Sequence, residues 1–138
     1  MQIVIDTNIL VSALLNEASL PARLLTLWRL RHFHVVTSTA QLDEIGRVTR
    51  YAKLREYLNP VKTGRLVNNL RELATIYDHL PNVADCSDPN DNFLLAMVEK
   101  SEADFLITGD KADLISMERY AGARIVTVRQ FLEVHKLI

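Results

Sequence analysis

Apolar and polar residues follow one another along the chain in blocks that predict strands and helices in turn. Two short apolar runs, residues 3–5 and 105–107, each stop abruptly at polar residues. Runs of this length with polar ends are typical of strands that are buried on both faces of a parallel sheet. Elsewhere apolar residues recur at the three- and four-residue spacing of helices. The pattern therefore predicts an α/β fold.

Capping residues and prolines predict where several of these helices begin. Ser38 and Gln41, three residues apart, predict a capping box. Asp88 before Pro89 predicts a helix start with Asp88 as the cap. The predicted helices span residues 9–15, 21–31, 40–50, 51–58, 61–77, 111–117 and 129–136, with another from residue 89, and the predicted strands span residues 3–5, 34–37, 105–107 and 124–128. This alternation predicts a parallel sheet with helices on both faces.

The size and composition of the chain narrow its class. The 138 residues predict one domain, residues 1–138, that is large enough to bury a single core. Of these residues 49% are hydrophobic and 24% charged, as in globular proteins, and a net charge of −1 indicates no particular partner. The single cysteine, Cys86, excludes an internal disulfide. The first residues also lack the pattern of a signal peptide or membrane span, so we expect a cytoplasmic protein with no membrane contact.

Carboxylates follow both of the short apolar runs. The first run leads into Asp6, Thr7 and Asn8, and the second leads into Thr108, Gly109 and Asp110. Ligands of open α/β sheets bind outside the carboxyl ends of the strands, so Asp6 and Asp110 are candidates for one site. Carboxylates gathered together raise each other's pKa, and a divalent cation with oxygen ligands relieves this repulsion. The alternative is that each acid only caps the helix that follows it.

Acids elsewhere in the chain are harder to assign from the residues alone. Glu44 lies on an amphipathic helix beside Asp43, where a solvated role is the simpler interpretation. Asp88 and Asp91 both suit a helix N-terminus, with Asp88 the better cap and Asp91 the better ligand. The four histidines lack metal-ligand spacing, and the chain has neither a glycine-rich phosphate loop nor a nucleophile elbow. Hydrolysis by a carboxylate-bound metal is consistent with these absences.

Charge is unevenly distributed along the chain. Residues 47–71, which form a predicted helical arm, contain seven basic residues and only one acid, Glu56. The basic residues are Arg47, Arg50, Lys53, Arg55, Lys62, Arg65 and Arg71. Between residues 78 and 113 nine acids face only Lys100 and Lys111. An acidic metal pocket beside a basic arm suits a polyanion. The alternative is that the arginines form an ordinary solvated helical face.

Four stretches together resemble the PIN-domain nucleases, and specifically their small bacterial and archaeal members that act as toxins of toxin and antitoxin pairs. In chain order they read IVIDTNILVSALL, STAQLDEIGRV, DPNDNFLLAMVEKSEADFLITGDKADL and RIVTVRQFLE. The resemblance covers essentially the whole chain. It implies an α/β/α sandwich around a central parallel sheet of about four to five strands.

The resemblance also implies an activity and its residues. In this family four acids bind Mg²⁺ or Mn²⁺ and cut phosphodiester bonds, mostly in single-stranded RNA. By motif the four acids here are Asp6, Glu44, Asp91 and Asp110, and the residues expected to support them are Thr7, Asn8, Thr108, Asp88 and Asp113. The implied partners are RNA, an antitoxin protein and a second copy of the chain in a homodimer.

Two other functions fit parts of the pattern. Haloacid-dehalogenase-type phosphatases also begin with a strand that ends in Asp, but they place a second Asp where this chain has Asn8. Release of phosphate from a small phosphomonoester would favour that class. A non-catalytic module that binds protein or RNA through its acidic end is the other alternative.

Overall fold

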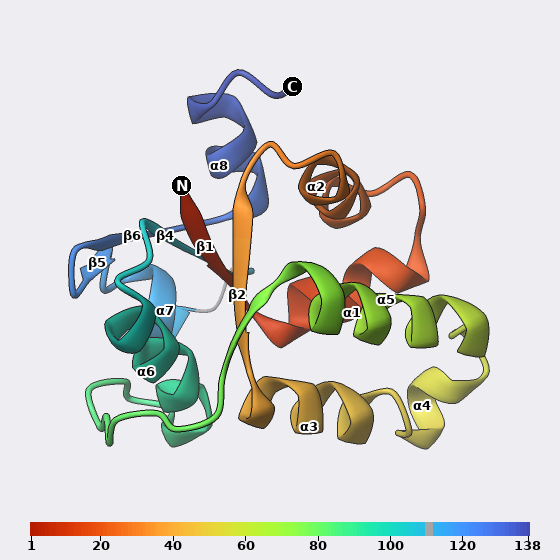
Figure 1. Cartoon of the computed structure of the whole chain (residues 1–138), viewed down its shortest axis with the longest axis horizontal. Coiled ribbons are helices and arrows are strands. Elements are labelled where there is room, and N and C mark those ends of the chain that lie inside the picture. Colours follow the sequence, from red (N-terminus) through yellow and green to blue (C-terminus); the bar gives the residue numbers. More distant parts are fainter. Residues whose placement is uncertain (110–111) are drawn as a thin grey trace.

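The computed structural model describes residues 1–109 and 112–138 (Figure 1). Within these residues one six-stranded sheet has the order β3-β2-β1-β4-β6-β5. Its strands are β1 (Gln2–Ile5), β2 (His34–Ser38), β3 (Thr75–Tyr77), β4 (Phe105–Ile107), β5 (Arg119–Tyr120) and β6 (Ala123–Val126). All neighbouring strands are parallel except β5, which pairs with β6 in antiparallel fashion. The predicted α/β fold with a parallel central sheet is confirmed.

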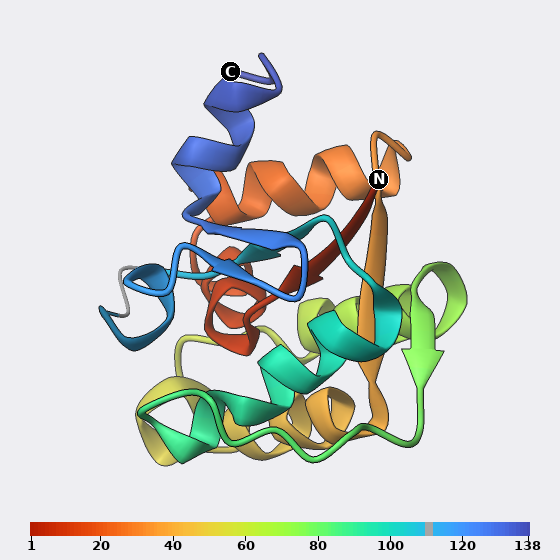
Figure 2. The same cartoon turned by 90° about the vertical axis from the view of Figure 1, so that its left-hand side faces the viewer.

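Helices cover both faces of this sheet (Figures 1 and 2). They are α1 (Thr7–Leu15), α2 (Leu20–Arg29), α3 (Thr39–Val48), α4 (Ala52–Arg55), α5 (Pro60–Leu73), α6 (Asn92–Ser101), α7 (Ala112–Ile115) and α8 (Val128–Val134), with a short 3-10 helix at Pro89–Asp91. Figure 1 shows β2 running into α3 at the lower end of the sheet, and α6 beginning near the same end. The carboxyl ends of the strands therefore face α3 and the start of α6.

The central strand β1 is apolar at consecutive positions because both of its faces are covered by the core. Its Ile3 and Ile5 side chains belong to the core cluster on the side of α1, α2, α5 and α8, and its Val4 side chain to the cluster on the side of α6 and α7. All three are fully buried. Successive side chains of a strand point to opposite faces, so a strand covered on both faces has no polar position to alternate with. This burial fixes the position of the residue that follows β1.

Two strands were missed by the sequence analysis. The predicted helix 61–77 is wrong at its end, because α5 stops at Leu73 and residues Thr75–Tyr77 form β3 beside β2. β5 is only two residues long and returns to β6 through Ala121 and Gly122, both with positive φ. The predicted strand 124–128 ends earlier, at Val126 in β6, because Thr127 caps α8.

The predicted capping residues are present, with one change of role. The Asp88 side chain caps the 3-10 helix by accepting from Asn90 N, as predicted. Ser38 Oγ accepts from Gln41 N at 3.1 Å, which confirms Ser38 as a cap. The Gln41 side chain does not complete the box and instead enters the core. In the described part of the chain, no helix is both long and apolar enough to cross a membrane.

Candidate functional site

Asp6 lies at the carboxyl end of the central strand and is 2% exposed. Its backbone N–H continues the sheet by donating to Ile107 O at 2.8 Å. Its Oδ1 accepts from Asn8 N at 3.0 Å and so caps α1, while its Oδ2 accepts from Thr108 Oγ1 at 2.7 Å. The capping alternative for Asp6 is thus correct, and it coexists with a carboxylate held at the ligand-binding edge of the sheet. Each carboxylate oxygen has two lone pairs and can take more than one partner.

The residues predicted to support Asp6 do so in different ways. Thr108 follows β4 and is fully buried, so its hydroxyl is a fixed donor to Asp6. Thr7 is 1% exposed, and its Oγ1 accepts from Gln41 Nε2 at 3.4 Å. Asn8 contacts Asp6 through its backbone N–H, while the residue itself is exposed.

Gln41 ties α3 to the end of β1, a role that the sequence analysis did not find. Its Nε2 donates to Ile5 O at 2.6 Å, and its Oε1 accepts from Thr37 Oγ1 at 2.7 Å. The side chain is fully buried. A glutamine three residues after a capping serine also fits a capping box. The sequence alone therefore did not distinguish a glutamine that completes the capping box from one that bonds to β1 in the core.

Glu44 lies one helical turn beyond Gln41 and is half-buried. Since Gln41 is bonded to the residue before Asp6, α3 brings Glu44 to the same end of the sheet as Asp6. Glu44 also lines a surface groove together with Asn90, the residue before Asp91. Glu44 therefore faces the groove between α3 and the start of α6.

Asp91 ends the 3-10 helix that leads into α6 and is 5% exposed. Asp88, at the start of the same turn, is half-buried and engaged in capping. The loop before this turn is held to α6 by Asn92 Oδ1, which accepts from Cys86 N at 2.9 Å. The capping role predicted for Asp88 is confirmed, while the role of Asp91 as a metal ligand stays a prediction.

The pKa of the Cys86 thiol is affected by several acids near this turn. Burial raises the pKa of its thiol, a backbone hydrogen bond at Asp88 opposes that rise, and the charges of Asp91, Asp113 and Asp88 add to it. Asp113 is joined to the same loop, because Ser87 Oγ donates to Asp113 Oδ1 at 2.6 Å. Asp88, Asp91 and Asp113 therefore all contribute negative charge around the loop that carries Cys86.

Three of the four acids implied by the family resemblance, Asp6, Glu44 and Asp91, lie among the described residues. Asp110 lies outside the described residues. Within residues 1–109 and 112–138, no three His, Cys, Asp or Glu side chains are gathered so that they could hold a metal ion. The donor chemistry nevertheless suits Mg²⁺ or Mn²⁺, since the buried groups at this edge are carboxylates, and carboxylate oxygens are the ligands that these hard cations prefer.

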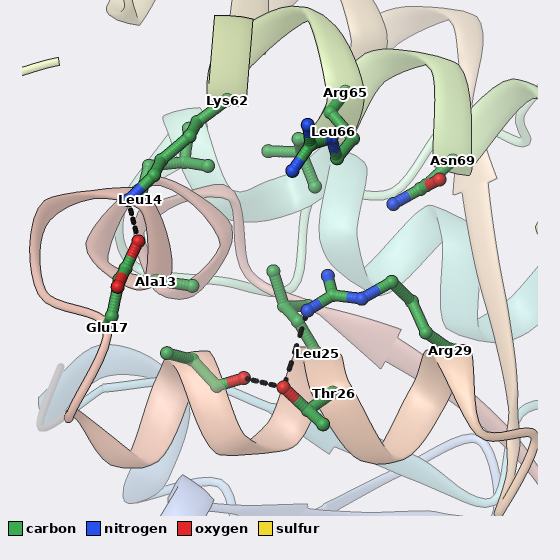
Figure 3. Close-up of a pocket in the computed structure, with 11 residues that line it drawn as sticks. Ala13, Leu14, Glu17, Leu25, Thr26, Arg29, Lys62, Arg65, Leu66 and Asn69 are labelled. Carbon is green, nitrogen blue, oxygen red and sulfur yellow. Dashed lines mark hydrogen bonds and ion pairs between the residues drawn. The ribbon is translucent and has the colours of Figure 1, made fainter. Parts of the chain in front are cut away.

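A second hollow, of about 300 Å³, lies between α1, α2 and α5 and contains none of the predicted acids (Figure 3). Its floor is apolar, with Leu25 and Leu66 among its lining residues. Arg29 and Arg65 also line it, and Lys62 forms an ion pair with Glu17 at its side. The basic arm is thus divided, because Lys62 and Arg65 face this hollow while Arg47 and Arg50 line the groove beside Glu44.

Comparison with known proteins agrees with this architecture. A family model described as PIN domain matches residues 2–112. An uncharacterized protein of Methanocaldococcus jannaschii is 35% identical over 118 residues, which cover 85% of this chain and 75% of that protein. No solved structure was found to match the chain.

Proposed function

The chain belongs to the PIN-domain family, whose members are generally nucleases, and we propose that it is a metal-dependent endoribonuclease that hydrolyses phosphodiester bonds of single-stranded RNA. The observation that carries the proposal is the position of Asp6. Its carboxylate is buried at the carboxyl end of the central strand, where α/β sheets bind their ligands. A carboxylate oxygen can bind a cation in addition to accepting a hydrogen bond, and hard cations prefer carboxylate oxygens, so a carboxylate at this edge is suited to a metal.

Four acids hold the metal in this proposal, namely Asp6, Glu44, Asp91 and Asp110. Mg²⁺ or Mn²⁺, when bound, would lower the pKa of a water molecule and neutralise charge that develops on the phosphate. Thr108 fixes the Asp6 carboxylate, and Gln41 fixes the helix that carries Glu44. The other supporting residues in this proposal are Thr7, Asn8, Asp88 and Asp113.

The choice of RNA as substrate is supported by the charges around the acids. Arg47 and Arg50 line the same groove as Glu44, so two positively charged side chains lie near one of the proposed metal-binding acids. Such a juxtaposition suits a polyanion whose backbone contacts the cations while one phosphate meets the metal.

The wider role proposed here comes from the sequence resemblance. Small family members of this kind act as toxins that an antitoxin protein inhibits, and they commonly form homodimers. We extend both properties to this chain on the strength of that resemblance. We also propose the cytoplasm as its compartment, because its single cysteine is a free thiol.

The test is cleavage of a labelled single-stranded RNA by purified protein with Mg²⁺, Mn²⁺ or EDTA. Wild type should cut only with metal, and Asp6→Asn should cut nothing while its thermal unfolding stays close to wild type. Asp104→Asn is the matched control, because Asp104 is an exposed acid at the opposite end of β4, where it accepts from Gln2 N at 2.8 Å. Cutting by Asp6→Asn at the wild-type rate would refute the proposal. Release of phosphate from a phosphomonoester, with RNA left intact, would favour the phosphatase class instead.

A further inference from the structure

A groove of about 700 Å³ runs between α3 and the start of α6. One wall is formed by residues of α3 and by Arg50 just after it, and the other by Asn90 and Phe93; the α3 residues are Ala40, Leu42, Asp43, Glu44, Gly46 and Arg47. Glu44 therefore belongs both to the proposed metal site and to the groove.

Two arginines, Arg47 in the last turn of α3 and Arg50 just after the helix, add positive charge to the wall that also carries Asp43 and Glu44. Arg47 is exposed, donates to the Tyr51 hydroxyl, and has its guanidinium carbon 5.8 Å from the centre of the Tyr51 ring. A cation is attracted to an aromatic face, so this contact favours a position of the guanidinium beside the Tyr51 ring. Arg50 is exposed as well, and its Nη1 lies 3.5 Å from the point where a Cβ at Gly46 would stand. Arg50 therefore lies back along the helix over Gly46, on the side that faces the groove.

The opposite wall offers different chemistry. Phe93 is half-buried in the first turn of α6, so its ring is fixed by packing and still reaches the groove. Asn90 is exposed and carries an amide that can both donate and accept. Proteins bind single-stranded nucleic acid with basic residues along the backbone and aromatic rings against the bases, and this groove has both.

We infer that this groove binds the RNA strand next to the bond that is cut, with Arg47 and Arg50 on phosphates and Phe93 against a base. The inference rests on the proposed function and adds to it the residues that position the substrate. It also assigns only part of the basic arm to RNA. Arg65 lines the separate hollow of Figure 3 together with Arg29, and these two residues have no place in the groove.

The test measures binding, so it does not depend on cleavage. A labelled single-stranded RNA is titrated with the Asp6→Asn protein in EDTA, and binding is followed by fluorescence anisotropy at several salt concentrations. Adding Arg47→Ala and Arg50→Ala should raise Kd roughly tenfold. The slope of log Kd against log salt should fall by about 1.4, since each phosphate contact on a single strand contributes roughly 0.7.

Arg29→Ala with Arg65→Ala in the same background is the matched control, because it removes the same charge from the other hollow. It should change Kd less than about twofold, whereas an effect as large as that of the groove pair would overturn the inference. Phe93→Leu keeps an apolar side chain in the packed position and loses the ring. It should weaken RNA binding about fivefold and leave binding of an abasic strand unchanged. Equal binding of RNA by all variants would also overturn the inference.

The two proposals can fail separately. If the wild-type protein cuts no RNA with any metal, the nuclease assignment fails. If Arg47→Ala with Arg50→Ala still weakens RNA binding in that case, the assignment of the groove as an RNA-binding surface is retained. If wild type cuts RNA and the Arg47→Ala and Arg50→Ala protein cuts it with an unchanged KM, the groove assignment fails and the nuclease stands.

Discussion

The Thr108 hydroxyl donates a 2.7 Å hydrogen bond to Asp6 Oδ2 across 102 positions of the chain. Both residues are buried, and each directly follows one of two neighbouring strands, β4 and β1. The bond therefore joins the ends of the two central strands at the point where the proposed metal site lies. It is an interaction whose loss should affect stability and cleavage together.

Thr108→Val keeps the shape of this side chain and removes its donor. Loss of a buried hydrogen bond to a charged group should lower the free energy of unfolding by about 2 kcal/mol, and cleavage should fall because Asp6 loses its orientation. Thr108→Ser retains the hydroxyl, so it should keep most of the free energy of unfolding and most of the cleavage rate of the wild-type protein. Urea unfolding and RNA cleavage measure the two effects, and a Val variant as stable and as active as wild type would contradict the assignment.

Gln41→Met should destabilise the fold because it leaves Ile5 O and the Thr37 hydroxyl without their partner in the core. Each unpaired buried group costs about 1–3 kcal/mol, so we expect a loss of roughly 3 kcal/mol or more in urea unfolding. Gln130→Met is the matched control, because Gln130 is an exposed member of the capping box of α8. Its loss should cost only about 0.5–1 kcal/mol. Equal effects of the two changes would show that Gln41 does not tie α3 to β1.

The Cys86 thiol should react slowly in the folded protein. Its pKa is raised chiefly by burial, so less thiolate is present at a given pH than for a thiol with the ordinary value of 9.0. Alkylation by iodoacetamide at mildly alkaline pH should be much slower than in urea, and Asp113→Asn should change the rate little because burial is the main cause. The stabilisation linked to this shift is complete below pH 9 and is lost as the pH rises through the raised pKa. A native rate equal to that in urea would exclude this environment.

Tyr120 should be a late-titrating tyrosine. Its hydroxyl donates to Asp85 Oδ2 at 2.6 Å, and this bond is the main reason why its pKa is raised from 10.0 to about 12. A group with a raised folded pKa stabilises the fold fully below pH 10, and that contribution disappears as the pH rises through 12. Tyrosinate absorbance should show a tyrosine that ionises near pH 12, and Asp85→Ala should move it towards its ordinary value. An unchanged titration curve in that variant would contradict the bond.

The parts of the fold that sequence predicted well are those in which burial leaves a strong pattern. β1 and β4 are covered on both faces, and their apolar runs located them and the polar residues after them. Asp88 was also predicted correctly as a cap, because Asp and Pro in succession have a specific local meaning. In each case the local preference and the tertiary structure agree.

The errors occur where the structure overrides a local pattern. Residues 75–77 continue the helical spacing of α5, but pairing with β2 makes them a strand. β5 is too short to give a pattern of its own. For the candidate site, the strand ends predicted Asp6 and Asp110 at one edge, and the family resemblance added Glu44 and Asp91. The hydrogen bond from Gln41 to Ile5 was not predicted, because it joins residues 36 positions apart in the chain.

The order of the strands has a consequence for synthesis on the ribosome. β1 precedes every other strand in the chain, yet its neighbours in the sheet begin at residues 34 and 105. A nascent chain that has not yet emerged beyond β4 lacks one side of its central strand and the Thr108 hydroxyl that holds Asp6. The proposed nuclease would therefore complete its site only late in translation, after β4 has paired with β1.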